Sequence, residues 1–97
     1  MPTYILLTHF TEQGIRNVKE TTKRAQAFRE TAKKLGITVK DLYWTLGEYD
    51  SAAIVDAPDE GSVTALGLSV GIQGNIRTKT IRAFTSDEMN KILNRMA

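Results

Sequence analysis

The side chains of this sequence that could do chemistry begin with its single histidine, His9. We expect His9 at the end of a strand, just before a helix N-terminus whose free backbone N–H groups favour anions. Arg77 is the best-placed cation to join it, because a guanidinium makes bidentate contacts with carboxylates and phosphates. The pair predicts an anion site, or an acid–base role for His9. The simpler alternatives are a histidine that donates to a backbone carbonyl and an arginine that pairs with Asp56 or Asp59.

A second group of candidate residues is the run Gly47-Glu48-Tyr49-Asp50. Two carboxylates beside a phenol allow an acid–base interpretation. Turn chemistry is the simpler explanation, because Gly47 supplies a positive φ and Asp50 accepts backbone N–H bonds, while the ring of Tyr49 packs. We therefore assign Gly47, Tyr49 and Asp50 to a structural turn.

The neighbours Tyr43 and Trp44 lie in a predicted strand, so their side chains must point to opposite faces of the sheet. One of them belongs beside the helices and the other in a barrel or cleft. Together with His9 and Arg77, they are our candidate ligand-binding residues. The sequence identifies no catalytic residue.

Several chemistries are excluded by composition and motif. The chain has no cysteine and one histidine, so it carries no metal signature and no thiolate nucleophile. Gly67, Gly71 and Gly74 lie within and at the end of a predicted helix and lack the Lys-Ser/Thr of a P-loop. Small residues for close packing of the helix on the sheet explain these glycines better. We expect no metal and no cofactor.

The net charge of +2 is small, and its basic part is local. Residues 12–35 hold seven basic and three acidic side chains, and the spacing predicts three ion pairs along an exposed helix. The pairs are Glu12/Arg16, Glu20/Arg24 and Glu30/Lys34. Residues 52–55, in the predicted third strand, lack the aromatic side chains with which an RNA recognition motif stacks bases. We therefore expect no nucleic-acid partner.

The apolar runs of the chain are only a few residues long, whereas a membrane helix needs about 20. The first strand begins within three residues of the N-terminus, with no basic and apolar leader ahead of it. We expect no membrane partner and a cytoplasmic location.

Periodicity and turn residues predict the elements that must position these side chains. Strands are expected at residues 3–10, 37–46, 52–57 and 75–84. A helix of about six turns is expected between Thr11 and Gly36, and a second one between Pro58 and Gly74. A last helix begins with a capping box formed by Thr85 and Glu88. It carries a predicted buried stripe of Met89, Ile92, Leu93 and Met96.

This order is that of a single α+β domain over residues 1–97, a ferredoxin-like β-α-β-β-α-β arrangement with a C-terminal helix. Both helices pack on one face of the sheet, yet the first strand is apolar on both faces: Tyr4 and Leu6 on one, Ile5 and Leu7 on the other. A sheet with one face in water alternates apolar and polar residues. We therefore expect a second copy of the chain on the other face, through a two-fold interface.

The topology also leads us to predict which candidates lie together. Taking the first and third strands as parallel, we expect His9, Pro58-Asp59, Asn75 and Arg77 near one edge of the sheet. The turn at residues 47–50 then belongs to the opposite edge, with Ala83-Phe84, so that His9 and Asp50 are separated within one chain.

Two spaced segments resemble a known family. The run Gly47-Glu48-Tyr49-Asp50, followed by Ile54-Val55 and Pro58-Asp59, is similar to the GYD domain family. Gly74-Asn75-Ile76-Arg77-Thr78 and Ala83-Phe84 resemble its second segment, so the resemblance covers nearly the whole chain. It implies a dimeric α/β barrel in which two ferredoxin-like sheets face each other. It implies no particular reaction, because the wider superfamily includes cofactor-independent oxygenases, haem enzymes and ligand-sensing domains.

The function expected from these observations is a small homo-oligomeric protein that binds a small organic ligand, with an anionic ligand as one option, in a barrel or in a cleft between sheet and helices. Trp44 or Tyr43 would line this site, and Arg77 or His9 would form its polar end. One alternative is an enzyme of the cofactor-independent oxygenase or isomerase type that uses the same cleft. Another is a structural or regulatory interaction module.

Overall fold

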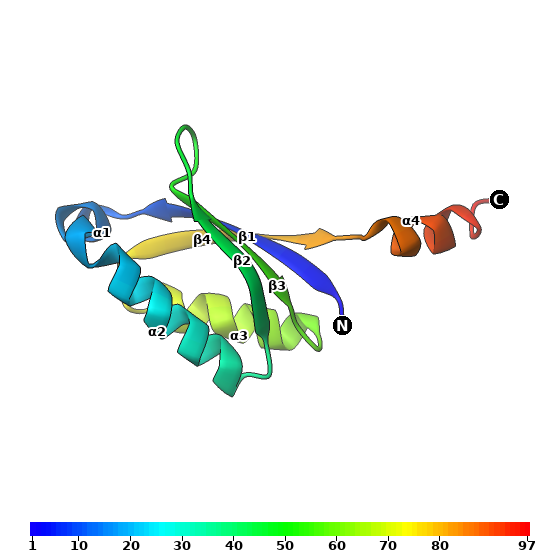
Figure 1. Cartoon of the computed structure of the whole chain (residues 1–97), viewed down its shortest axis with the longest axis horizontal. Coiled ribbons are helices and arrows are strands. Elements are labelled where there is room, and N and C mark those ends of the chain that lie inside the picture. Colours follow the sequence, from blue (N-terminus) through cyan, green and yellow to red (C-terminus); the bar gives the residue numbers. More distant parts are fainter.

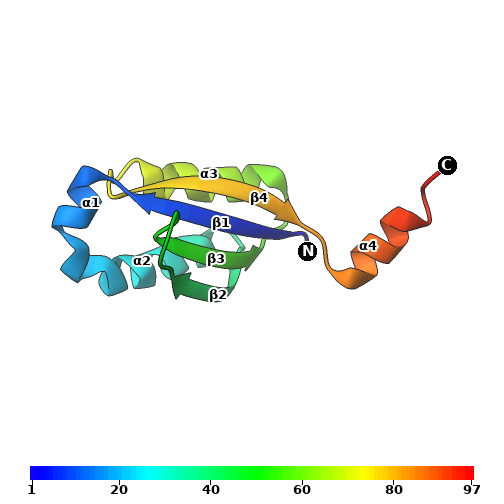
Figure 2. The ribbon, with the colours of Figure 1, turned by 90° about the horizontal axis from the view of Figure 1, so that it is seen from above.

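The computed structural model describes all 97 residues, Met1 to Ala97. Four strands form one antiparallel sheet in the order β2-β3-β1-β4, and α2 and α3 lie on one of its faces (Figures 1 and 2). This is the α+β, ferredoxin-like architecture expected from the sequence. The elements are β1 (Thr3–Phe10), α1 (Glu12–Arg16), a 3-10 turn (Val18–Glu20), α2 (Thr21–Lys34), β2 (Thr38–Trp44), β3 (Ser51–Asp56), α3 (Glu60–Gly71), β4 (Ile76–Ala83) and α4 (Ser86–Leu93).

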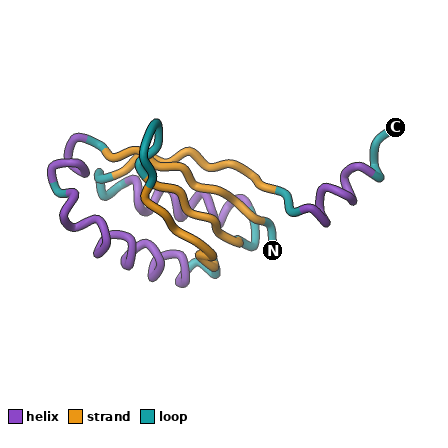
Figure 3. Tube along the Cα trace, turned by 45° about the horizontal axis from the view of Figure 1, so that its top comes forward, coloured by secondary structure: helices purple, strands orange, loops and turns teal.

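The core lies between the sheet and the two helices, and β1 shows why. Its side chains alternate, so Tyr4, Leu6 and Thr8 are buried against the helices while the residues between them are only half-buried. Leu6 is paired with Ala53 of β3, and both belong to the same buried cluster as Leu66 of α3. The opposite face of the sheet carries no helix (Figure 3). We call it the open face; its residues include Ile5, Leu7, His9, Tyr43, Ala52, Ile54, Arg77, Lys79 and Ile81.

The direction of the third strand corrects one expectation. β1 and β3 are antiparallel, with Thr3 opposite Asp56 and Thr8 opposite Ser51, so the prediction that they are parallel is wrong. In a βαβ unit the strands on either side of the helix are the parallel ones, here β1 and β2, and the hairpin then reverses β3. The end of β1 therefore meets the hairpin that joins β2 to β3. Pro58-Asp59 and Ala83-Phe84 lie at the other end of the sheet, beside Thr3.

The first helical segment is not the continuous helix predicted for residues 12–35. Asn17 leaves the helical conformation, with φ −106° and ψ 28°, and a 3-10 turn separates α1 from α2. The free carbonyl groups at this break are bound by Arg24, which donates to Asn17 O at 2.9 Å and to Gly14 O at 3.2 Å. The predicted Glu20/Arg24 pair is therefore not formed, and Glu20 contacts Lys23 instead at 3.4 Å. Glu12/Arg16 and Glu30/Lys34 form no ion pair either.

Helix α3 lies close to the sheet because it is rich in small residues. A Cβ atom added at Gly67 would lie 3.4 Å from Thr78 Oγ1 of β4, a contact that leaves little room for a larger side chain. Asp59 caps the helix by accepting a hydrogen bond from Ser62 N at 2.7 Å. This hydrogen bond lowers the pKa of the Asp59 carboxyl, because it favours the charged form.

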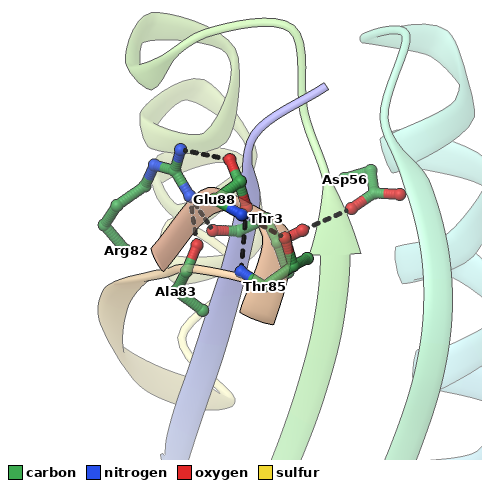
Figure 4. A network of polar contacts seen from close by, with 6 residues as sticks. All are labelled: Thr3, Asp56, Arg82, Ala83, Thr85 and Glu88. Carbon is green, nitrogen blue, oxygen red and sulfur yellow. Dashed lines mark hydrogen bonds and ion pairs between the residues drawn. The ribbon is translucent and has the colours of Figure 1, made fainter. Parts of the chain in front are cut away.

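Helix α4 begins at the predicted residues, but its position relative to the sheet is unexpected. The capping box of Thr85 and Glu88 is present, and Arg82 Nη2 also donates to Glu88 Oε2 at 3.2 Å (Figure 4). The hydrogen bond from Thr85 N lowers the pKa of the Glu88 carboxyl most, and the hydrogen bond from Arg82 lowers it further. The helix itself projects away from the rest of the chain (Figure 1). The predicted burial of its stripe is therefore wrong for a single chain: Met89, Leu93 and Met96 are exposed and Ile92 is half-buried.

Candidate functional site

A cavity of about 80 Å³ lies between the sheet and helices α2 and α3, and it is open to solvent on one side. Ten of its 17 lining residues are hydrophobic. Strand β1 provides Leu6, Thr8 and Phe10, because every second residue of the strand faces the helices. Phe28 of α2 and Val70 of α3 close the other sides. The site is thus built on regular elements and has a mainly apolar wall.

The polar groups of the cavity are mostly uncharged. The hydroxyls of Thr8 and Ser51 hydrogen-bond to each other across β1 and β3. Thr21, Thr31, Gln73 and Asn75 add further hydroxyl and amide groups. The lining contains no carboxylate and no imidazole, and its one cation is Arg24. Such a lining is typical of sites that hold an apolar group and orient it with a few hydrogen bonds.

Arg24 is the residue of this site that sequence reasoning missed. The sequence pattern assigns it to an ion pair on an exposed helix face, but it lies beside the cavity with its guanidinium carbon 5.9 Å from the centre of the Phe10 ring. The sequence signal that was available is the Gly14 and Asn17 pair, since both residues weaken a helix and together indicate a break. A break leaves carbonyl groups free, and these hold Arg24 in place.

The two neighbouring aromatic residues of β2 point to opposite faces of the sheet. Trp44 lines the cavity, and its Nε1 donates to Thr21 Oγ1 at 2.9 Å. Tyr43 is opposite Ala52 on the open face and is 57% exposed. Of the four candidate ligand-binding residues, Trp44 alone lines this cavity.

The other two candidates, His9 and Arg77, are directly opposite each other in the β1–β4 pairing, on the open face. The His9 ring lies 4.8 Å from the ring of Tyr49, and Lys79 Nζ lies 5.8 Å from the centre of the same Tyr49 ring. Neither Arg77 nor Lys79 forms an ion pair. The anion site expected at His9 and Arg77 stays a prediction, and it belongs to a different face from the cavity.

The alternative partners suggested for Arg77 are engaged elsewhere, so that interpretation is wrong. Asp56 accepts a hydrogen bond from Thr3 Oγ1 at 2.9 Å (Figure 4) and lies 3.9 Å from Lys40 Nζ. Asp59 caps α3.

The turn at residues 47–50 lies against the end of β1, which corrects its predicted separation from His9. Gly47 has a φ of +116°, a conformation that favours glycine. Asp50 N donates to Thr8 O at 2.8 Å, and Asp50 Oδ2 accepts from Phe10 N at 2.8 Å. Asp50 thus joins the β2–β3 hairpin to the last residues of β1, directly beside the cavity.

We expect Asp50→Ala to lower the free energy of unfolding by about 2 kcal/mol, because the half-buried Phe10 N–H loses a charged acceptor. Asp50→Asn keeps a neutral acceptor and should lower it by about half as much. Urea denaturation at neutral pH measures both. Glu48→Ala, an exposed change in the same turn, is the control and should have little effect. Equal stabilities of the Asp50→Ala and Glu48→Ala variants would contradict this role.

No helix of the structure is long and apolar enough to cross a membrane.

Comparisons with known proteins place this architecture in a family. A relative from Thermus thermophilus, named "Glutamine synthetase and cystathionine beta-lyase binding protein", is 31% identical over 84 residues, 86% of this chain and 88% of the relative. The crystal structure of TTHA0845 from the same organism has a TM-score of 0.56 at 24% identity, covering 89% of this chain and 96% of that one.

An ACT domain protein from Streptococcus pneumoniae has a TM-score of 0.52 at 17% identity, covering 100% of this chain and 98% of that one, and it supports the fold alone. The GYD domain profile matches residues 4–93, which include the Gly-Glu-Tyr-Asp turn and nearly all of the four strands. This chain therefore belongs to the GYD domain family.

Proposed function

We propose that this chain is a homo-oligomeric binding protein that takes the apolar end of a small organic molecule into the cavity between its sheet and helices. The observation that carries the proposal is the cavity itself, with its mainly hydrophobic lining and few polar groups. A volume of about 80 Å³ is about half that of an apolar cavity known to hold benzene, so it accommodates a short chain or part of a ring whose remainder reaches the open side. The open side lets the rest of a longer ligand reach solvent.

Binding is favoured over catalysis because the cavity offers no group suited to moving a proton at neutral pH. His9 lies on the open face, and no carboxylate lines the cavity. Arg24 takes the place that Arg77 had in the sequence-based expectation, as the cation at the polar end. A ligand with an acidic group would meet its guanidinium.

The test uses Trp44, the only tryptophan of the chain, as a fluorescent reporter that lines the cavity at its solvent-exposed side. We expect benzyl alcohol and benzoate to change Trp44 emission in a saturable way. Ala25→Leu on α2 places extra side-chain atoms in the cavity and should abolish the saturable change. Thr22→Leu, an exposed change on the same helix, is the matched control and should leave it intact. Identical titrations of the two variants would overturn the proposal.

A second candidate function is the binding of another protein, and the name of the Thermus thermophilus relative favours it. The relative is named for binding two enzymes, and this chain exposes apolar side chains on its open face and on α4. The Ala25→Leu and Thr22→Leu variants also distinguish protein binding from ligand binding in the cavity. A protein partner captured equally by the Ala25→Leu and Thr22→Leu variants binds outside the cavity.

We infer that the oligomer is a dimer joined through the open faces of two sheets. The support is the apolar content of that face, where Ile5, Leu7, Ile54 and Ile81 are neighbours in the β-pairing. A monomeric domain rarely leaves such a patch in water. Sedimentation of the chain as a stable monomer at micromolar concentration would contradict the dimer.

A further inference from the structure

The C-terminal residues 84–97, which we call the terminal arm, carry apolar side chains that no part of the same chain covers. Phe84, Met89, Leu93 and Met96 are 49%, 42%, 52% and 73% exposed. Met89 and Leu93 are four residues apart and so lie on one side of α4, and Met96 follows three residues beyond its end. An eight-residue helix without a packing surface is only marginally stable in water. The terminal arm therefore needs a surface to cover this stripe.

The contacts at the base of the terminal arm set its direction. Arg82 Nη1 donates to the carbonyl oxygens of Thr3, at 3.2 Å, and of Ala83, while its Nη2 binds Glu88 (Figure 4). The Arg82 guanidinium carbon also lies 4.5 Å from the centre of the Phe84 ring. These contacts hold the first turn of α4 to the end of β4, and from there the helix continues away from the sheet (Figures 1 and 2). The stripe consequently stays off the open face of its own chain.

The exposed area of the chain is larger than that of a compact monomer of the same length. The chain exposes 6657 Å², whereas a compact monomer of this length exposes about 5,500 Å². The excess of about 1,100 Å² is larger than the about 800 Å² that each partner buries in a standard interface. The radius of gyration is 14.5 Å, compared with about 12.5 Å for a compact domain of this length.

We propose that the terminal arm packs along the edge of the open face of a second copy of this chain, beside the contact between the two sheets, so that two copies exchange arms. This inference rests on the proposed dimer and adds which segment completes its interface. A second copy is the occupant that fits, because each chain has both an uncovered arm and an uncovered apolar sheet face, and a two-fold arrangement covers both at once. Charge repulsion does not oppose this contact. The arm is neutral, with Asp87 and Glu88 balanced by Lys91 and Arg95, and the whole chain has a net charge of only +2.

The proposal is tested by cross-linking, for which the cysteine-free sequence is well suited. A chain with Leu93→Cys on the stripe is mixed with a tagged chain that carries Tyr43→Cys on the edge strand β2 of the open face, and a short bis-maleimide is added. We expect a cross-linked heterodimer in several-fold higher yield than with Lys91→Cys, which lies on the other side of α4. Equal yields from the two arm positions, or no heterodimer, would overturn arm exchange.

Sedimentation equilibrium separates this inference from the dimer on which it rests. The double variant Leu93→Gln/Met96→Gln should raise the dimer dissociation constant at least about tenfold, because it removes apolar surface from the interface. Lys91→Gln introduces the same side chain on the other side of α4 and should leave the dimer dissociation constant unchanged. A dimer of unchanged affinity in the double variant overturns arm exchange and leaves the sheet-to-sheet dimer standing. A wild-type chain that is monomeric overturns both and assigns the arm to another partner.

Discussion

Gly14→Ala is expected to lower the free energy of unfolding by about 3 kcal/mol or more, a large loss for a single methyl group. A Cβ atom at this position would overlap the carbonyl oxygen of Asn75 and lie 2.9 Å from its carbonyl carbon. Both are backbone atoms, so no side chain can rotate to make room. Relief requires that α1 move away from the start of β4.

The surrounding contacts make that movement costly. Thr11 N donates to Asn75 O at 3.0 Å, and Thr11 Oγ1 donates to Gly74 O at 2.5 Å. Gln13 Nε2 donates to Gln73 O at 3.1 Å and to Asn75 Oδ1 at 2.9 Å. A shift of α1 breaks several of these hydrogen bonds together. Because Gln73 and Asn75 line the cavity, the variant should also lose the Trp44 response to benzyl alcohol.

Urea denaturation measures the loss, and Gly71→Ala provides the matched control. Gly71 lies in α3, has no atom within 4 Å of an added Cβ and has no positive φ. Alanine there should be neutral or should stabilise the chain by up to about 1 kcal/mol, since it restricts the unfolded chain. If the two alanine variants had the same stability, the close approach of α1 to β4 would be refuted.

Leu6→Ala is expected to lower the free energy of unfolding by about 3 kcal/mol and to enlarge the cavity. Leu6 is 1% exposed, belongs to the buried cluster and also lines the cavity. Its removal takes away apolar burial and leaves a space that the strands on either side of β1 cannot close. The variant therefore tests the packing of the core and the proposed ligand site together.

The control for this second change is Leu68→Ala, because Leu68 is 70% exposed and should contribute less than about 0.5 kcal/mol. Benzyl alcohol at saturating concentration should raise the melting temperature of the Leu6→Ala variant more than that of wild type, since the larger cavity offers it more contacts. A Leu6→Ala variant as stable as wild type would mean that the cavity wall is not part of the packed core.

Local signals in the sequence were sufficient for most of the elements. The strands follow from runs rich in β-branched, apolar and aromatic residues, and the ends of helices from Gly36, Gly74 and the capping box at Thr85. The break near Asn17 was missed because the periodicity of the apolar residues continues across it. The contacts that stabilise the break come from Arg24, which binds the free carbonyl groups there from the next helix.

The candidate site was less predictable, because its residues come together across the fold. Trp44 was identified as a candidate, but the sequence left open which face it takes, and the β2–β3 register decided this. Arg24 was hidden within a basic helix face. The relation between His9 and the turn at Asp50 depended on the direction of β3, and the wrong direction placed them at opposite edges.

The sequence by itself determined the order of the strands and the main helices, the ferredoxin-like fold and the family, because these depend on local patterns along the chain. The tertiary structure decided which side chains share a cavity, that Asp50 joins the hairpin to β1, and that α4 stands clear of the sheet. These features depend on strand direction, register and the geometry set by Arg82, which involve residues far apart in the sequence. An apolar stripe such as that of α4 indicates that another surface must cover it, but the sequence does not identify the chain that provides this surface.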